Sequence, residues 1–131
     1  MRVFTIAAAL AAALHGAAGA QDAPRFLAET YPSQALGPFL EGYAALKGED
    51  AALDLRTFEL IALAVAAQIP CDYCVYAHAK EARRAGATEA ELRKAVAAAG
   101  VIRHLSTVLN GAAYDFEAFR EEHDAMAPPV N

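Results

Sequence analysis

The amino-acid sequence predicts an all-α fold, a bundle of five or six helices. Alanine is abundant, tryptophan is absent and β-branched residues are sparse, which favours packed helices over sheets. Apolar residues recur at helical spacing in several segments, and capping and breaker residues separate those segments. After the first 20 residues there is neither an internal repeat nor a low-complexity run.

The first expected helices are short and contain proline. Residues 22–32 hold two prolines and are interpreted as an arm with one helical turn. A helix is expected over 33–47 with Ser33 as its cap, and residues 48–50 are expected to break it. Its start is left open by Pro38, because proline is tolerated only in the first turn of a helix. The apolar side of this helix would carry Leu36, Phe39, Leu40, Tyr43, Ala44 and Leu46.

The next two helices should form a hairpin around Pro70. Asp54 is a good N-cap for the first of them, over 55–69, which is almost wholly apolar. A helix that is apolar all round is buried, here against neighbours in the chain or in another subunit. Pro70 ends this helix, and a new one is expected over 71–85 with Gly86 as its stop.

A capping box should open the helix that follows. Glu91 lies three residues after Thr88, the spacing at which the two side chains cap each other's backbone. This helix is expected over 88–98, and Gly100 is expected to end it.

The last expected helix covers about residues 101–122, with a possible kink at Gly111 and a frayed tail over 126–131. Its apolar residues at helical spacing include Ile102, Leu105, Val108, Leu109, Ala112 and Phe116.

The N-terminus has the pattern of a cleaved secretory signal. One positive charge precedes a short apolar run, which ends at the small residues Ala18-Gly19-Ala20. The run is shorter than the roughly 20 apolar residues that span a bilayer. The alternatives are a buried N-terminal helix and an uncleaved anchor. We therefore expect a signal peptide over 1–20, one domain over 21–131, and export to the periplasm.

Charge and composition exclude some partners. The formal net charge is −5, and no basic run or interleaved aromatic pattern appears, so nucleic-acid binding has no electrostatic footprint. A second long apolar run is absent from the sequence, so we expect no membrane contact after signal cleavage.

The chain has only two cysteines, Cys71 and Cys74, in a C-x-x-C motif. Residues three and four apart share a helix face, so Cys71 can approach Cys74, and His78 lies one turn further on. The first turn of a helix and a C-x-x-C pair both stabilise a thiolate, lowering the thiol pKa from about 8.5 to roughly 3.5–7.5. His78 could take the proton from Cys74.

Glu59 lies twelve positions before Cys71, on the apolar helix. A carboxylate there is costly to bury without a partner. If the two helices form a tight hairpin around Pro70, Glu59 and His78 lie at similar height on facing helices. We therefore expect thiol chemistry with its own proton-handling pair.

Less specific interpretations exist for these residues. The cysteines could form an inert disulfide, although so short a loop yields little entropic stabilisation. Zinc could bind to Cys71, Cys74, His78 and Glu59, but this spacing fits no structural zinc pattern well, and we expect no metal. Tyr73 and Tyr76 are interpreted as packing residues or pocket walls.

Glu59, Cys71-Asp72-Tyr73-Cys74 and His78 together resemble the core motif of the AhpD-like alkylhydroperoxidase family, within the carboxymuconolactone decarboxylase superfamily. The resemblance covers about residues 53–99. It implies an AhpD-like helical bundle that assembles into trimers or hexamers and reduces hydroperoxides with thiols. Cys74 would be the peroxidatic thiol and Cys71 the resolving thiol, with His78 and Glu59 as the proton relay.

Two features depart from that family. Tyr73 stands where the best-studied members have a histidine, and most typical members are cytosolic, whereas this sequence begins with the pattern of a secretory signal. We expect a thiol-dependent peroxidase or disulfide oxidoreductase that acts without a cofactor and is recycled by an external dithiol. The alternatives are a lyase of the decarboxylase type, although that decarboxylase lacks the dithiol, and a non-catalytic assembly protein with a structural disulfide.

Overall fold

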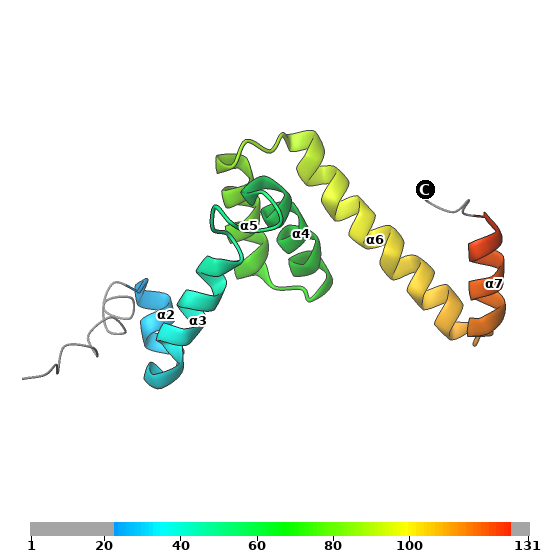
Figure 1. The fold of residues 1–131 in the computed structure, drawn as a ribbon, viewed down its shortest axis with the longest axis horizontal. Coiled ribbons are helices and arrows are strands. Elements are labelled where there is room, and N and C mark those ends of the chain that lie inside the picture. The colour runs from blue at the N-terminus through cyan, green and yellow to red at the C-terminus, as the bar shows by residue number, and fades with distance from the viewer. Residues whose placement is uncertain (1–22, 127–131) are drawn as a thin grey trace, which may run out of the picture. The chain divides into compact units, whose positions relative to one another are not determined.

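The computed structural model describes residues 23–126, which form six α-helices and no strand (Figure 1). The predicted all-α fold is confirmed. The predicted signal peptide over 1–20 lies outside the described residues. Compact packing divides the chain into two units, one ending at Asp54 and the other beginning at Leu55. Within residues 23–126, no helix combines the length and the apolar character needed to cross a bilayer.

The first unit holds α2 (Arg25–Thr30) and α3 (Ser33–Ala45). The predicted single turn is a six-residue helix, and the predicted cap is wrong, because Ser33 is the first helical residue and follows the N-cap Pro32. Pro38 lies inside α3, beyond its first turn. Stacked aromatic rings pack within this unit. The ring centroids of Tyr31 and Phe39 are 4.8 Å apart, and those of Phe39 and Tyr43 are 5.9 Å apart.

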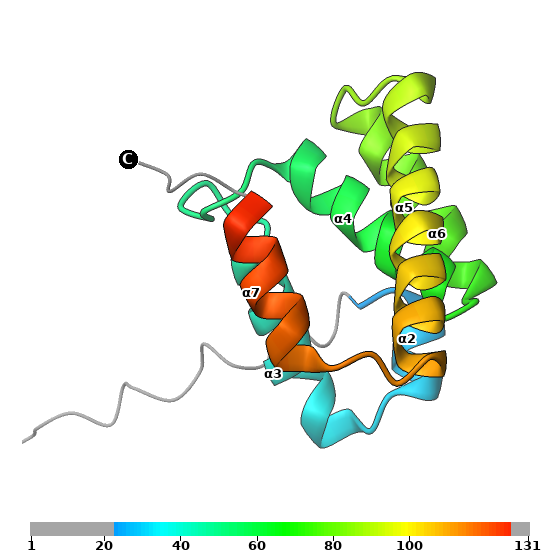
Figure 2. The ribbon, with the colours of Figure 1, turned by 90° about the vertical axis from the view of Figure 1, so that its right-hand side faces the viewer.

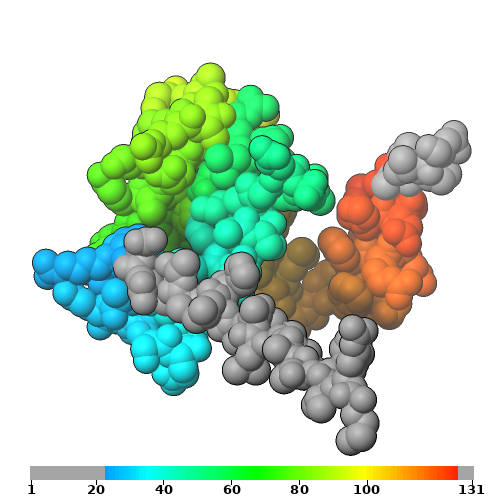
Figure 3. Space-filling view, turned by 60° about the vertical axis from the view of Figure 1, so that its left-hand side comes forward, coloured from blue at the N-terminus to red at the C-terminus, as the bar shows by residue number. Residues whose placement is uncertain are grey.

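The second unit begins with the predicted hairpin of α4 (Leu55–Gln68) and α5 (Asp72–Arg84). Asp54 directly precedes α4, and Pro70 lies between the two helices, as expected. Figure 3 shows α4 and α5 packed into one body, in the green part of the chain. Only one face of α4 is buried, whereas Ile61 and Val65 on another face are exposed. Neighbours among residues 23–126 therefore do not bury α4 on all sides, and its expected burial against another subunit stays a prediction.

Gly86 ends α5 in a Schellman motif. The N–H of Ala87 donates to the carbonyl of Ala82 at 2.9 Å, and that of Gly86 donates to Arg83 at 3.0 Å. Gly86 has a φ of 90°, in the left-handed region that glycine enters without steric cost. The motif brings Ala82 and Ala87 together in the core of the unit.

The helix α6 (Glu89–Gly111) is longer than predicted. Gly100 does not end it, because a glycine inside a helix costs only about 1 kcal/mol relative to alanine and the backbone hydrogen bonds continue through it. The predicted break at Gly100 and the predicted start of a helix at Val101 are therefore wrong. Figure 1 shows α6 continuing beyond α4 and α5, and Figure 2 shows α4 inclined to it.

The chain turns after Gly111 and enters α7 (Phe116–Met126), so the predicted helix over 101–122 is divided at this point. Ala113 has a φ of 49°, and a second Schellman motif joins Tyr114 to Leu109 and Ala113 to Asn110. Oδ1 of Asp115 then accepts the N–H of Ala118 at 2.8 Å and caps α7.

The core of the second unit consists of small and branched apolar residues from three helices and one turn. Small side chains allow the helices to approach closely, so α4 packs on both α5 and α6. The buried cluster contains Leu63, Ala82, Ala87 and Leu92, and Leu60, Val75 and Ala79 pack against it.

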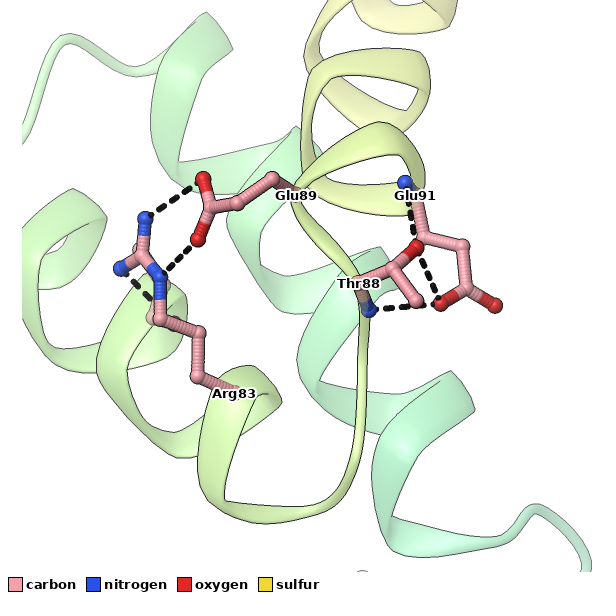
Figure 4. A network of polar contacts seen from close by, with 5 residues as sticks. Arg83, Thr88, Glu89 and Glu91 are labelled. Atoms are coloured by element: carbon pink, nitrogen blue, oxygen red, sulfur yellow. Dashed lines mark hydrogen bonds and ion pairs between the residues drawn. The ribbon is translucent and has the colours of Figure 1, made fainter.

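Polar contacts at the start of α6 hold it to α5 (Figure 4). Thr88 and Glu91 form the predicted capping box, in which the N–H of Thr88 donates to Glu91 at 2.7 Å. This backbone hydrogen bond lowers the pKa of the Glu91 carboxyl. The guanidinium of Arg83 donates to both carboxylate oxygens of Glu89 and lowers the pKa of that carboxyl.

Candidate functional site

The two cysteines lie at the bend between α4 and α5. Cys71 and Cys74 are joined by a disulfide, with their Cα atoms 5.3 Å apart. Both residues are half-buried, so the bridge lies at the protein surface. The hairpin around Pro70 brings the C-terminal end of α4 beside this bridge.

Cys71 is the N-cap of α5. Its Sγ accepts the backbone N–H of Cys74 at 3.2 Å, the role that a serine or aspartate oxygen has in other helices. A helix N-terminus carries partial positive charge, so this N–H stabilises negative charge on Cys71 Sγ. The sequence indicated that Cys71 begins the helix, but capping by a sulfur atom was not expected.

Glu59 and His78 are brought together from the two helices of the hairpin. Nδ1 of His78 lies 2.7 Å from Oε2 of Glu59. The Glu59 side chain is 1% exposed and that of His78 is 19% exposed. In the tautomer that carries its hydrogen on Nδ1, His78 donates to this carboxylate oxygen, and Nε2 is the nitrogen that can accept a proton. The hairpin thus places these two residues at the same height, as predicted from the sequence.

His78 follows Cys74 by one helical turn, so both lie on the same side of α5. That side borders the buried face, which carries Val75, Ala79 and Ala82. All four predicted site residues therefore belong to one hairpin, two of them joined by a disulfide and two by a hydrogen bond.

Tyr73 and Tyr76 are not packed in the interior. Tyr73 is 89% exposed and Tyr76 is 69% exposed, so neither is a packing residue of the interior, and their role as pocket walls stays a prediction. On α5 they are three residues apart and share the outward face. The side chain of Tyr73, which lies between the two cysteines together with Asp72, therefore points to the outside of the fold.

A protein metal site needs three or more ligating side chains close together. In that part of the chain, no three His, Cys, Asp or Glu side chains are grouped so that they could hold a metal ion. Thiolates are the zinc-binding form of cysteine, and here both sulfurs are in the disulfide.

An apolar groove of 620 Å³ lies between α4 and α6, away from the disulfide. Leu60, Ala64 and Ile102 line its floor and walls, whereas Glu59, His78 and the cysteines are not among its lining residues. Arg103 lies at one end and donates to the Gln68 side chain at 2.7 Å and to its carbonyl at 3.1 Å, which caps the C-terminal end of α4.

The family model for the carboxymuconolactone decarboxylase family matches residues 35–114, more than half of the chain. The chain belongs to the carboxymuconolactone decarboxylase family. The match includes the whole α4–α5 hairpin and confirms the AhpD-like resemblance that the motif predicted. Members of this family are often enzymes, either peroxidases or decarboxylases.

A solved structure supports the same assignment. The chain is similar to a protein from Methanobacterium thermoautotrophicum whose crystal structure is known, with a TM-score of 0.60 and 36% sequence identity. The similarity covers 68% of this chain and 97% of that one. At this identity, the shared helical fold indicates homology.

A curated relative is the protein described as uncharacterized protein 4 in the cox locus of Paracoccus denitrificans. It is 46% identical over 54 residues, which are 41% of this chain and 49% of the relative. The match thus spans about half the length of this curated relative.

Proposed function

We propose that this chain is a thiol-dependent peroxidase that reduces hydroperoxides through Cys71 and Cys74. The observation that carries the proposal is the buried hydrogen bond between Glu59 and His78. His78 lies one helical turn after Cys74 of the disulfide. A disulfide with only a structural purpose needs no buried acid–base pair beside it. Membership of a family with peroxidase members supports the same reaction class.

The proposed oxidation uses both thiols. Cys74 thiolate attacks the terminal oxygen of R–O–O–H, the O–O bond breaks, and R–O⁻ takes up a proton and leaves as R–OH. Cys74 becomes a sulfenic acid. Cys71 thiolate then attacks Cys74 Sγ and displaces hydroxide, which takes up the proton that Cys71 released and leaves as water. One hydroperoxide is reduced by two electrons, and the two thiols are oxidised to the disulfide found in the structure.

Protons are handled by His78 in this scheme. Nε2 of His78 takes the proton from Cys74 and returns it to the leaving oxygen. Glu59 accepts from Nδ1 and holds the imidazole in the tautomer with a basic Nε2. Because Glu59 is buried, its carboxylate keeps its orientation while His78 changes protonation state.

The N-cap hydrogen bond supports Cys71 as the resolving thiol. A resolving cysteine must be a thiolate when it attacks the sulfenic acid. The N–H of Cys74 is directed at Cys71 Sγ and stabilises that thiolate.

The cycle closes only with an electron donor from outside the chain. The sequence has no third cysteine, so an external dithiol must reduce the disulfide. We also propose that the protein acts after export, as the pattern over 1–20 predicts, in a compartment where the disulfide is the resting state.

Stopped-flow thiol titration tests the proposal. The reduced protein is mixed with one molar equivalent of a hydroperoxide, and free thiols are followed with time. Wild type should lose both thiols, and Cys74→Ser should consume no peroxide. Cys71→Ser is the matched control, because it should consume one equivalent and stop at a sulfenic acid that a dimedone probe captures. Unchanged peroxide consumption by Cys74→Ser would contradict the assignment.

A lyase of the decarboxylase type remains the second candidate. The Glu59–His78 pair favours it, since such a pair can move protons on a carbon acid without any thiol. Carboxymuconolactone turnover by both wild type and Cys74→Ser would support the lyase, whereas no turnover by either would remove it.

A further inference from the structure

The surface around the disulfide contains large apolar side chains. Ile69 is 61% exposed two residues before Cys71, Tyr73 is exposed between the two cysteines, and Tyr76 is exposed two residues after Cys74. Pro70, directly before Cys71, is exposed as well. Exposed apolar residues therefore lie on both sides of Cys71 in the sequence. Contiguous exposed apolar residues on a soluble domain commonly mark a surface that another molecule covers.

Packing within residues 23–126 does not explain why these large side chains are apolar, because they remain exposed there. The buried face of α5 carries Val75, Ala79 and Ala82, which is the opposite side from the tyrosines. Tyr76 lies under the ammonium group of Lys80, whose Nζ is 5.7 Å from its ring centroid. The tyrosines thus form an outward face of two aromatic rings and one cation beside a redox bridge.

The electrons for the bridge come from outside the chain, because its sequence contains no other cysteine. A small thiol needs only access to a sulfur atom, and exposed tyrosines give it nothing to bind. Its thiolate would also approach the exposed carboxylate of Asp72, which lies between the cysteines and repels negative charge. A protein dithiol offsets that repulsion by covering apolar surface, and tyrosine is enriched where proteins bind each other.

We propose that Ile69, Tyr73 and Tyr76 form the docking surface for a protein dithiol that reduces the Cys71–Cys74 disulfide. This inference rests on the proposed redox function of the disulfide. It adds the class of the reductant, a folded protein with two cysteines, and the residues that select it over small thiols.

The reduction proceeds in two exchanges. One thiolate of the partner attacks Cys74 Sγ, a bond forms between these sulfurs, and the Cys71–Cys74 bond breaks. Cys71 leaves as a thiolate, which the N–H of Cys74 stabilises, and takes up a proton. The second thiolate of the partner then attacks its own sulfur in the mixed disulfide and releases Cys74. Two electrons and two protons reach this chain, and the partner becomes a disulfide.

The test compares two reductants on one disulfide. Thioredoxin serves as the protein dithiol and dithiothreitol as the small one, and the rate of disulfide reduction is measured in stopped flow. The double variant Tyr73→Ser, Tyr76→Ser should react with thioredoxin about tenfold more slowly, as the loss of an aromatic hot spot predicts, and with dithiothreitol within twofold of wild type. Tyr114→Ser, an exposed tyrosine at the far end of α6, is the control and should match wild type.

Three outcomes would overturn the inference. The first is a wild-type protein that thioredoxin reduces no faster than dithiothreitol at equal concentration. The second is an equal loss of rate with both reductants in the double variant. The third is a light-scattering mass of the double variant that differs from that of wild type, which would show that the tyrosines contact another copy of this chain.

Failure of the peroxidase proposal can be told apart from failure of this inference. Peroxide consumption is measured with dithiothreitol as the only reductant, a reaction that needs no docking surface. If it proceeds while the tyrosines have no effect, the docking surface is wrong and the peroxidase stands. If peroxide consumption is absent while thioredoxin reduction depends on the tyrosines, the peroxidase proposal is wrong and the docking surface stands.

Discussion

Glu59 is a carboxylate buried on a helix that is otherwise almost wholly apolar. An isolated buried charge is costly, and protein structures keep one only where it is paired. His78 supplies the pairing at 2.7 Å, from the other arm of the hairpin. At the residue scale, this buried pair distinguishes the bend between α4 and α5 from a helix turn that carries no ionisable groups.

Glu59→Gln should slow the chemical step and leave the disulfide able to form. Glutamine keeps the size and one hydrogen-bond acceptor but does not bias the His78 tautomer as a carboxylate does. We expect peroxide-driven thiol loss to fall by about 10²-fold, the lower end of general acid–base contributions. Rapid-quench thiol counting measures it.

The matched control for that change is Glu81→Gln. Glu81 lies on α5, has a side chain that is 42% exposed, and pairs with Arg84 at 3.1 Å, so its variant should keep the wild-type rate. Equal rates in Glu59→Gln and wild type would show that Glu59 has no part in the proton relay.

For single residues, the sequence pattern predicted the positions of some side chains correctly and of others wrongly. The sequence predicted that Glu59 and His78 lie at similar height if the two helices form a tight hairpin around Pro70, and the structure brings them into contact. The sequence did not predict the outward face of Tyr73, since an aromatic residue on an amphipathic helix is more often packed. Whether a side chain at the edge of a helix face is covered depends on the neighbouring helix.

At the element scale, α5 and α6 end in the same motif with different residues. Both use a left-handed residue at the position after the C-cap, Gly86 in one helix and Ala113 in the other. An alanine there places its Cβ against the backbone, which costs roughly 1–2 kcal/mol. No atom lies within 4 Å of a Cβ built on Gly86, so the space itself is open and only the backbone conformation matters.

The two ends should therefore respond in opposite directions to exchange of glycine and alanine. We expect Gly86→Ala to destabilise the fold by about 1 kcal/mol and Ala113→Gly to stabilise it by about 0.5–1 kcal/mol, after the greater unfolded-chain entropy of glycine is subtracted. Urea unfolding followed by circular dichroism measures both.

A control at Gly100 separates conformation from helix propensity. Gly100 lies inside α6, where a glycine has helical φ, so Gly100→Ala should stabilise by up to about 1 kcal/mol. A stabilising Gly86→Ala would mean that α5 does not end in the left-handed conformation.

The signals at the ends of single helices also explain why the predicted helix break at Gly100 is wrong. A single glycine weakens a helix without ending it, and the true end of α6 carries a stronger signal. That signal is Asp115, which caps α7 directly after the turn and could have been recognised from the sequence.

At the scale of the whole molecule, many large apolar residues of the second unit are exposed. They include Ile61 and Val65 on α4 and Ile102, Leu105 and Val108 on α6. Surfaces of this kind mark contacts between chains. The exposed part of α6 continues from the apolar groove beside α4, and we propose that this apolar surface is where copies of the chain meet in the expected trimers or hexamers.

Leu105→Lys should disrupt that assembly. A lysine on the exposed apolar side of α6 would have to lose its hydration in a contact between copies. We expect wild type to be a trimer or hexamer in size-exclusion chromatography with light scattering, and the variant to shift to smaller species with unchanged helix content.

Thr107→Lys is the control for Leu105→Lys. Its hydroxyl donates to the carbonyl of Arg103, and its position lies away from the apolar side of α6, so the assembly should be unchanged. A monomeric wild type would contradict the expected oligomer.

The sequence by itself determined the helical fold, the hairpin around Pro70 and the residues of the candidate site. These depend on local signals, namely apolar spacing, caps and breakers, which act over one or two helical turns. The tertiary structure decided which apolar faces are covered, that α6 continues through Gly100, and that the tyrosines beside the disulfide face outward. Burial is a property of packed helices, so no local pattern can specify which side of a largely apolar helix meets a neighbour.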